Sequence, residues 1–175
     1  KVRKEAIDRF AELAFPTQKD EEWKYTNISS LLKHNFSPAA VKVNVSSDTI
    51  NKFLFDKMEH SLLVFVNGNF SPELSKLIDI PKGVVIGSLA EALKINNPVV
   101  KKHLGKYAEN ENYFFTSLSS AFTKDGAFIY VPDGKIVEDP IHIIFITQSD
   151  SEKIITQPRN LFVAGKNSQV TIIEH

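Results

Sequence analysis

Histidine side chains are the groups in this sequence best suited to bind a metal ion or to move a proton near neutral pH. None of the five has a second histidine or a carboxylate at the spacing that places two zinc ligands on one helix face. His142 and His175 are the strongest candidates, because each lies in an expected strand with an acidic residue nearby, Asp139 and Glu174. We interpret both histidines as polar residues at strand ends that face solvent or a turn.

Two adjacent carboxylates, Glu21 and Glu22, form the other candidate, a general acid–base pair. Neighbouring side chains on a helix diverge by about 100°, so these two cannot converge on one substrate atom. Together with Asp20 they suit the first turn of a helix, where negative charge stabilises the positive end of the helix dipole. We interpret them as structural residues.

The sequence contains no motif for nucleotide binding and no cysteine for thiolate chemistry. Gly165-Lys166 is followed by Asn167, and Asn160 stands where a Walker phosphate loop needs its first glycine. Gly-x-Gly-x-x-Gly does not occur, and the absence of cysteine excludes disulfides, thiolate-bound metals and a cysteine nucleophile within these residues. We therefore expect no catalytic residue, no cofactor-binding residue and no metal ligand in this sequence.

Trp23 and Tyr25 form an aromatic pair with two open interpretations. A tryptophan can anchor an interface with another protein, or it can pack under its own helical turn. The break at Pro16 should fold the following turn back onto the first helix. We therefore expect Trp23 to be structural and to pack against Phe10 and Leu13.

Helical spacing dominates the first two thirds of the sequence. Apolar residues between positions 6 and 14 predict a first helix that ends at Pro16. Caps or apolar spacing predict further short helical segments after Thr17, over residues 27–32, after Ser47 or Asp48, after a Ser88–Glu91 capping box, over residues 98–107 and over residues 113–122. Strands are expected over residues 62–66, before an Asn67-Gly68 turn, and over residues 84–86.

The last third of the chain is a series of β-branched and aromatic runs separated by turn residues. Strands are predicted over residues 128–131, 141–146, 159–164 and 170–173. In the second of these, alternate side chains point to opposite faces, Ile141, Ile143 and Phe145 to one and Ile144 and Ile146 to the other. That strand should be covered on both faces. The last run should leave an unpaired edge, which favours the front part of a longer β architecture.

Composition narrows the class of protein. The chain has 21 basic and 21 acidic residues, so nothing indicates nucleic acid or a charged membrane as a partner. No apolar run is long enough to span a bilayer. No signal-peptide stretch follows the first residues, although the start methionine is missing. We expect a soluble, cytoplasmic protein.

One segment resembles a known family. Residues 15–31, FPTQKDEEWKYTNISSL, closely resemble the Pro-Thr-x-x-x-Glu-x-Trp-Lys-Tyr-Thr signature near the start of SufD proteins, a branch of the SufB/SufD family. The matching residues are Pro16, Thr17, Glu21, Trp23, Lys24, Tyr25 and Thr26. Three less specific stretches, which begin at Leu63, Leu118 and Pro158, also resemble the family and occur in the same order, so the resemblance covers nearly the whole chain. SufB proteins lack the Trp-Lys-Tyr-Thr run, which favours the SufD branch.

The resemblance implies a truncated chain with an α+β N-terminal region over residues 1–110, followed over residues 111–175 by a linking helix and the first coils of a right-handed parallel β-helix. Such a protein pairs with SufB, binds the ATPase SufC and is a non-catalytic scaffold for iron–sulfur cluster assembly. The family's SufC-binding surface and cluster-related residues fall outside these positions, so no ligand is carried over. The lack of cysteine agrees, because thiolates ordinarily hold such clusters.

Two other functions stay open. A β-helix enzyme that acts on polysaccharide needs carboxylates or basic residues stacked on one face. The last third of the chain offers only acidic residues at scattered positions: Glu138, Asp139, Glu152 and Glu174. A free-standing adaptor could recruit a strand from another protein at its sheet edge, and the same edge could drive self-association. Further β coils after residue 175 would favour the scaffold.

Overall fold

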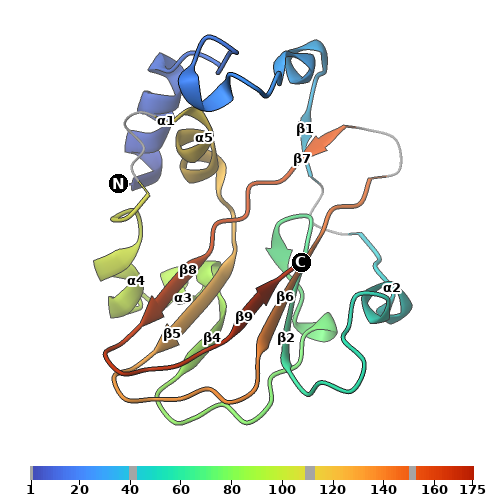
Figure 1. Cartoon of the computed structure of the whole chain (residues 1–175), viewed down its shortest axis with the longest axis vertical. Coiled ribbons are helices and arrows are strands. Elements are labelled where there is room, and N and C mark those ends of the chain that lie inside the picture. Colours follow the sequence, from blue (N-terminus) through green and yellow to red (C-terminus); the bar gives the residue numbers. More distant parts are fainter. Residues whose placement is uncertain (1, 40–42, 109–112, 150–152) are drawn as a thin grey trace.

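Two β-sheets lie face to face in the computed structural model, which describes residues 2–39, 43–108, 113–149 and 153–175 (Figure 1). Helices cover the outer side of one sheet, and a helix with extended chain covers the outer side of the other. Within the described ranges, no helix is long and apolar enough to cross a lipid bilayer.

The elements follow the expected order along the chain. The helices are α1 (Val2–Glu12), α2 (Ser47–Asn51), α3 (Leu89–Lys94), α4 (Pro98–His103) and α5 (Phe114–Phe122), with 3₁₀ turns at Glu21–Trp23, Ser29–Lys33 and Pro72–Leu74. The strands are β1 (Ser37–Pro38), β2 (Ser61–Val66), β3 (Asn69–Phe70), β4 (Val85–Ser88), β5 (Ala127–Val131), β6 (Ile141–Ile146), β7 (Ile154–Ile155), β8 (Leu161–Ala164) and β9 (Ile172–Glu174). The strands expected in the last third are therefore confirmed, while α4 ends four residues earlier than expected.

Two helix starts differ from the sequence-based expectation. The cap of α2 is Ser46, whose hydroxyl oxygen accepts a hydrogen bond from the backbone N–H of Thr49 at 3.3 Å, and not Ser47 or Asp48. Thr17 caps no helix, because its N–H donates to the Asp20 carboxylate at 2.7 Å and closes a separate turn. The Ser88 cap is confirmed, since its hydroxyl accepts from the N–H of Glu91 at 3.1 Å.

Both large sheets are mixed, with an antiparallel pair at one end, β2–β3 or β4–β5, and parallel pairs in the rest. One sheet has the order β3-β2-β6-β9 and the other β4-β5-β8, with β2, β6 and β9 mutually parallel and β5 parallel to β8. Phe128 lies opposite Leu161, 33 positions later, and Ile141 lies opposite Ile172, 31 positions later. The sequence shows no repeat of residue types at this interval, so the register of these pairs was not predicted, although the family resemblance implied coils stacked in parallel.

The turns between the sheets stack as well as the strands. The β5–β6 turn and the β8–β9 turn exchange backbone hydrogen bonds: Val137 N–H to Gln169 C=O and Gln169 N–H to Lys135 C=O, each 2.9 Å, and Gly134 N–H to Lys166 C=O, 2.8 Å. We call these two stacked turns, residues 132–140 and 165–171, the corner. Several corner residues of one coil are therefore matched to residues of the next, although the first turn is two residues longer than the second.

Two glycines permit the closest approaches between stacked segments. A Cβ added at Gly126 would lie 2.0 Å from the carbonyl oxygen of Arg159, and one added at Gly165 would lie 2.3 Å from the Asp133 carboxylate. Both distances are far inside van der Waals contact, so the parallel stacking of these segments depends on the missing side chains.

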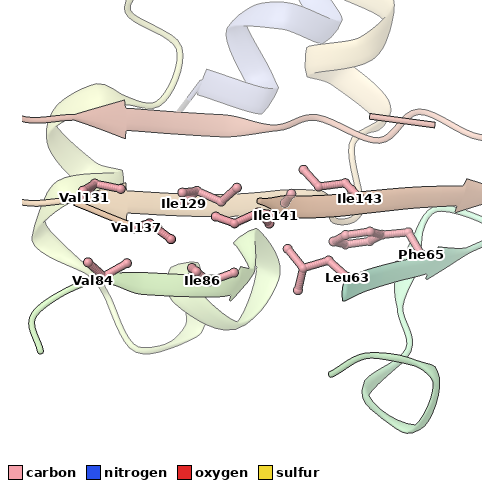
Figure 2. Close-up of a cluster of buried hydrophobic side chains, with 10 residues drawn as sticks. Leu63, Phe65, Val84, Ile86, Ile129, Val131, Val137, Ile141 and Ile143 are labelled. Atoms are coloured by element: carbon pink, nitrogen blue, oxygen red, sulfur yellow. The ribbon is translucent and has the colours of Figure 1, made fainter. Parts of the chain in front are cut away.

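The main core lies between the two sheets (Figure 2). Its buried members are Leu63, Phe65, Val84, Ile86, Ala127, Ile129, Val131, Val137, Ile141 and Ile143. The opposite face of β6 carries Ile144 and Ile146, which pack with Ile50 and Val64 under residues 43–54. The expectation that β6 is covered on both faces is confirmed.

Helices cover the outer face of the second sheet. Leu89 and Val100, from α3 and α4, pack with Phe128 of β5 and Leu161 of β8. Two further helices, α1 and α5, lie side by side at the end of the molecule away from the corner (Figure 1). Strands β2 and β4 come from the region before residue 110 and pair with β6 and β5. The division at residue 110 and the parallel β-helix stay predictions.

Candidate functional site

His142, the second residue of β6, is completely buried, which corrects the expectation that it faces solvent or a turn. It lies between Leu62 of β2 and Ile173 of β9 in the ladder. Its ring lies under residues 52–60, the α2–β2 connection, where the Phe55 ring is 5.1 Å away. The expectation was wrong because this cover comes from a distant part of the sequence, which the residues around His142 do not reveal.

Three histidines that are far apart in the sequence meet at this point. The ring centroid of His142 is 5.4 Å from that of His60 and 5.9 Å from that of His175. The Phe53 ring packs edge-on against His175 at 5.1 Å. We call His60, His142, His175, Phe53 and Phe55 the histidine cluster. The structure thus brings both sequence candidates, His142 and His175, together with His60, which the sequence analysis did not single out.

The surroundings of His142 favour its neutral form. Neither ring nitrogen has a hydrogen-bond partner. Burial lowers the pKa of His142 below its usual 6.5, and the positive charges that His60 and His175 carry when protonated lower it further. Across the described residues, no group of three or more His, Cys, Asp or Glu side chains could hold a metal ion, this cluster included. His142 is thus covered by side chains that are themselves partly exposed, Phe53 at 38% and Phe55 at 44%, and His175 is exposed as expected.

The carboxylates of Glu21 and Glu22 are exposed in the 3₁₀ turn Glu21–Trp23. Glu21 lies 3.8 Å from the ammonium group of Lys24, an exposed ion pair of little energetic weight. Both glutamates belong to the first turn of this short helix, the position in which we interpreted them.

Trp23 packs inward, but on a different helix from the one expected. Its ring lies 5.4 Å from the ring of Phe115, on α5. Phe10, the expected partner on α1, instead contacts Phe114 at 4.9 Å and Phe122 at 5.8 Å. The expected contact with Phe10 is not formed, because α5 lies against α1 and its Phe114 and Phe122 contact that ring, while Leu13 lines the same hollow as Trp23.

The signature segment also presents an aromatic ring outward. Tyr25 is 89% exposed, and the Lys24 ammonium lies 5.7 Å from its ring centroid. Leu32, shortly after the signature, is 65% exposed. Trp23 and Tyr25, only two positions apart, therefore differ in role, one packed against the helical pair and the other open to solvent.

Asp125 is a buried carboxylate that sequence reasoning missed. One oxygen accepts hydrogen bonds from the Ser88 hydroxyl at 2.8 Å and from the N–H groups of Ala90 and Gly126 at 2.9 and 2.8 Å. The other accepts from the N–H of Phe70 at 3.0 Å. Asp125 thus joins the start of α3 to both sheets. Its Asp-Gly dipeptide indicated only a turn, and nothing nearby marks the side chain as buried.

Strands β8 and β9 form the outer edges of the two sheets. Among the strands that the structure describes, β8 pairs with β5 alone and β9 with β6 alone. A sheet edge exposes backbone groups that can pair with a further strand. Both edges lie on the side of the stack that follows the last coil (Figure 1).

Comparison with known proteins identifies similar sequences over the whole chain. The family described as "SufBD protein N-terminal region" matches residues 1–143. The chain is 34% identical over 98% of its length to "Iron-sulfur cluster assembly SufBD family protein slr0076" of Synechocystis sp., covering 38% of that protein.

Two relatives from Bacillus subtilis carry more specific names. "Iron-sulfur cluster assembly protein SufD" is 24% identical over 99% of this chain, which covers 40% of that protein. "Iron-sulfur cluster assembly protein SufB" is 31% identical over 53% of this chain, which covers 20% of that protein. The chain therefore spans less than half the length of the relatives it matches.

Proposed function

Because this chain belongs to the SufBD family, we propose that it is the N-terminal part of a scaffold protein for iron–sulfur cluster assembly. The observation that carries the proposal is the family match over residues 1–143. The names of relatives that align with 98% and 99% of the chain support it, because both refer to this process. The proposed role is non-catalytic: the protein supplies a surface on which partners and a cluster are held.

The fold that goes with this role is a right-handed parallel β-helix. Its first coils would be β5–β6 and β8–β9. The parallel pairing of these strands and the hydrogen-bonded corner support the proposal, since a solenoid is built from segments that stack only on their neighbours. Later coils would add to the edges of β8 and β9.

The proposed branch is SufD, with a SufB-type protein and the ATPase SufC as partners. The Pro-Thr…Trp-Lys-Tyr-Thr signature supports this choice. So does the coverage of the comparisons, because the match to a SufD protein extends over 99% of the chain and the match to a SufB protein over 53%. The match to the SufB protein is shorter but more identical, 31% against 24% for the SufD protein. The proposed branch therefore rests on the signature and on the coverage, whereas the family rests on the whole match.

Co-purification of the full-length protein tests the function. The full chain is tagged, produced together with the SufB-type and SufC-type proteins of the same organism, and analysed by size-exclusion chromatography with light scattering. We expect one complex that contains all three proteins. Separate elution of the tagged protein from both others would contradict the proposed partners, and normal iron–sulfur enzyme activity in a strain that lacks the protein would contradict the proposed process.

A further inference from the structure

The α2–β2 connection lies on the outer face of the β2–β6–β9 ladder without backbone hydrogen bonds to it. Within residues 52–60, the backbone bonds run back to α2: Phe53 N–H to the carbonyl of Ile50 at 2.9 Å and Leu54 N–H to that of Asn51 at 3.4 Å. The ring of His60 contacts the carbonyl oxygen of Met58 at 2.8 Å, also within the connection. Side-chain packing alone therefore holds the described connection on the sheet.

That packing runs mainly through the histidine cluster. The connection contributes Phe53, Phe55 and His60, and the sheet contributes His142 from β6 and His175 after β9. Leu54 adds an apolar contact beside Ile144 and Val64. Release of the cluster would leave the connection tethered by little more than this one leucine.

The charged groups around His142 are few. Its ladder neighbours Leu62 and Ile173 are apolar. The acidic and basic residues of the connection are all exposed: Lys52, Asp56, Lys57 and Glu59. The Glu174 carboxylate accepts a hydrogen bond from the Asn160 amide at 2.9 Å. The groups whose charge acts on His142 are the other two histidines, both of the same sign as the imidazolium.

We propose that the histidine cluster is a pH-sensitive latch, which holds the α2–β2 connection on the sheet at neutral pH and releases it on acidification. A protonated imidazole has two N–H donors, and in this site neither has an acceptor. Such a buried, unpaired cation is strongly disfavoured relative to a hydrated one. Protonation of His60 and His175 adds repulsion, so the cluster gains charge most easily by opening to water.

The pH window follows from the direction of the His142 shift. Its pKa in the latched state lies below the ordinary 6.5, because burial disfavours the cation. The released state therefore binds the proton more tightly, so the latch is at full strength above about pH 6.5 and weakens as the pH falls. The open fraction should rise about tenfold per pH unit below that value, until the pH reaches the lowered pKa.

Release would expose an apolar surface that is now covered. Leu62 lies beside His142 on this face and is buried with it, and Leu54 of the connection packs in the same apolar cluster as Leu62. At acidic pH this face of the sheet becomes available to solvent or to another protein, while the core between the two sheets stays closed. The latch thus links proton concentration to the accessibility of one face of the fold.

Amide hydrogen exchange in the full-length protein tests the latch. The probes are the N–H groups of Phe53 and Leu54, whose bonds to α2 lose the shielding of the Phe53 ring when it leaves His175, and the β2 and β6 amides report global unfolding. After correction for intrinsic exchange, we expect exchange at the two probes to rise by up to about fivefold between pH 6.5 and pH 5.5, with the strand amides unchanged. An equal rise at the strand amides, or none at the probes, overturns the proposal.

Two variants separate the cluster from a general acid effect. His142→Leu keeps an apolar side chain in the site and should abolish the pH response, whereas His34→Gln, an exposed histidine outside the cluster, should leave it unchanged. The same pH response in His142→Leu overturns the proposal. If that variant does not fold, NMR titration of the wild-type ring decides: the pKa of His142 must lie below the ordinary 6.5, and a midpoint at or above that value overturns the latch.

Discussion

Asp125 and His142 are both buried polar residues, but their surroundings differ. Asp125 accepts four hydrogen bonds, which satisfy the backbone where α3 begins. His142 has no partner for either nitrogen and depends on being neutral. A buried polar group whose hydrogen bonds are all made holds the local structure in place. A buried polar group without hydrogen-bond partners is sensitive to a change in pH or solvent. The two residues therefore predict different experimental behaviour.

Asp125→Ala should lower the free energy of unfolding by at least about 3 kcal/mol, because it leaves several buried donors without an acceptor. The variant loses contacts to Phe70, Ala90 and Gly126 at once. Asp8→Ala, an exposed aspartate on α1, is the control and should change stability by less than about 0.5 kcal/mol. Urea denaturation measures both. Equal stability of the two variants would show that the Asp125 network is not needed.

Trp23→Ala should destabilise the protein by about 2 kcal/mol, below the range for a fully buried tryptophan, because the ring is only partly buried against Phe115. Tyr25→Ala, two positions later and 89% exposed, should leave thermal stability nearly unchanged. Thermal melting of both variants checks the pair. Unchanged stability in Trp23→Ala together with loss of SufB-type partner binding would make Trp23 an interface anchor instead.

At the scale of elements, the sequence predicted the strands of the last third but not how they pair. The β-branched run of β6 and its division between two faces were visible, because alternation is a local property. The stacking of Phe128 on Leu161 was not, since pairing depends on a match between distant backbones. The same limit explains His142 and Trp23: His142 was expected to face solvent or a turn and Trp23 to pack on α1, because the covering segment could not be read locally.

Gly126→Ala should destabilise the β5–β8 stack by about 2 kcal/mol or more, because its Cβ would meet the Arg159 backbone at 2.0 Å and neither strand can yield easily. Gly87→Ala, on β4, is the matched control: no atom lies within 4 Å of its added Cβ, so we expect no loss of stability. Chemical denaturation of the two variants tests this. A Gly126→Ala protein as stable as Gly87→Ala would mean that the strands can separate without cost.

At the scale of the molecule, the open edges of β8 and β9 predict concentration-dependent association of residues 1–175 produced alone. In the full-length protein a further coil would occupy these edges, so the longer chain should not associate through them. Static light scattering over a range of concentrations compares the two proteins. A strictly monomeric segment at high concentration would contradict the prediction.

Residues 1–175 should also stay colourless after anaerobic reconstitution with iron and sulfide. The sequence contains no cysteine, and thiolates are the usual cluster ligands. Visible absorbance spectroscopy after desalting is the measurement, with the full-length complex of the proposed partners as the positive control. A stable cluster absorbance in the segment would require ligands other than thiolates.

The corner has a consequence for how such a protein can change during evolution. Its turns are hydrogen-bonded from one coil to the next, Lys135 and Val137 to Gln169 and Gly134 to Lys166. One residue inserted into either turn would shift every later pair in that coil and move the strand's apolar side chains to the wrong face. The two corner turns already differ by two residues, nine in 132–140 and seven in 165–171, and a change of two keeps the faces of the following strand. Insertions and deletions of odd length should therefore gather in segments outside the stack, such as the α2–β2 connection.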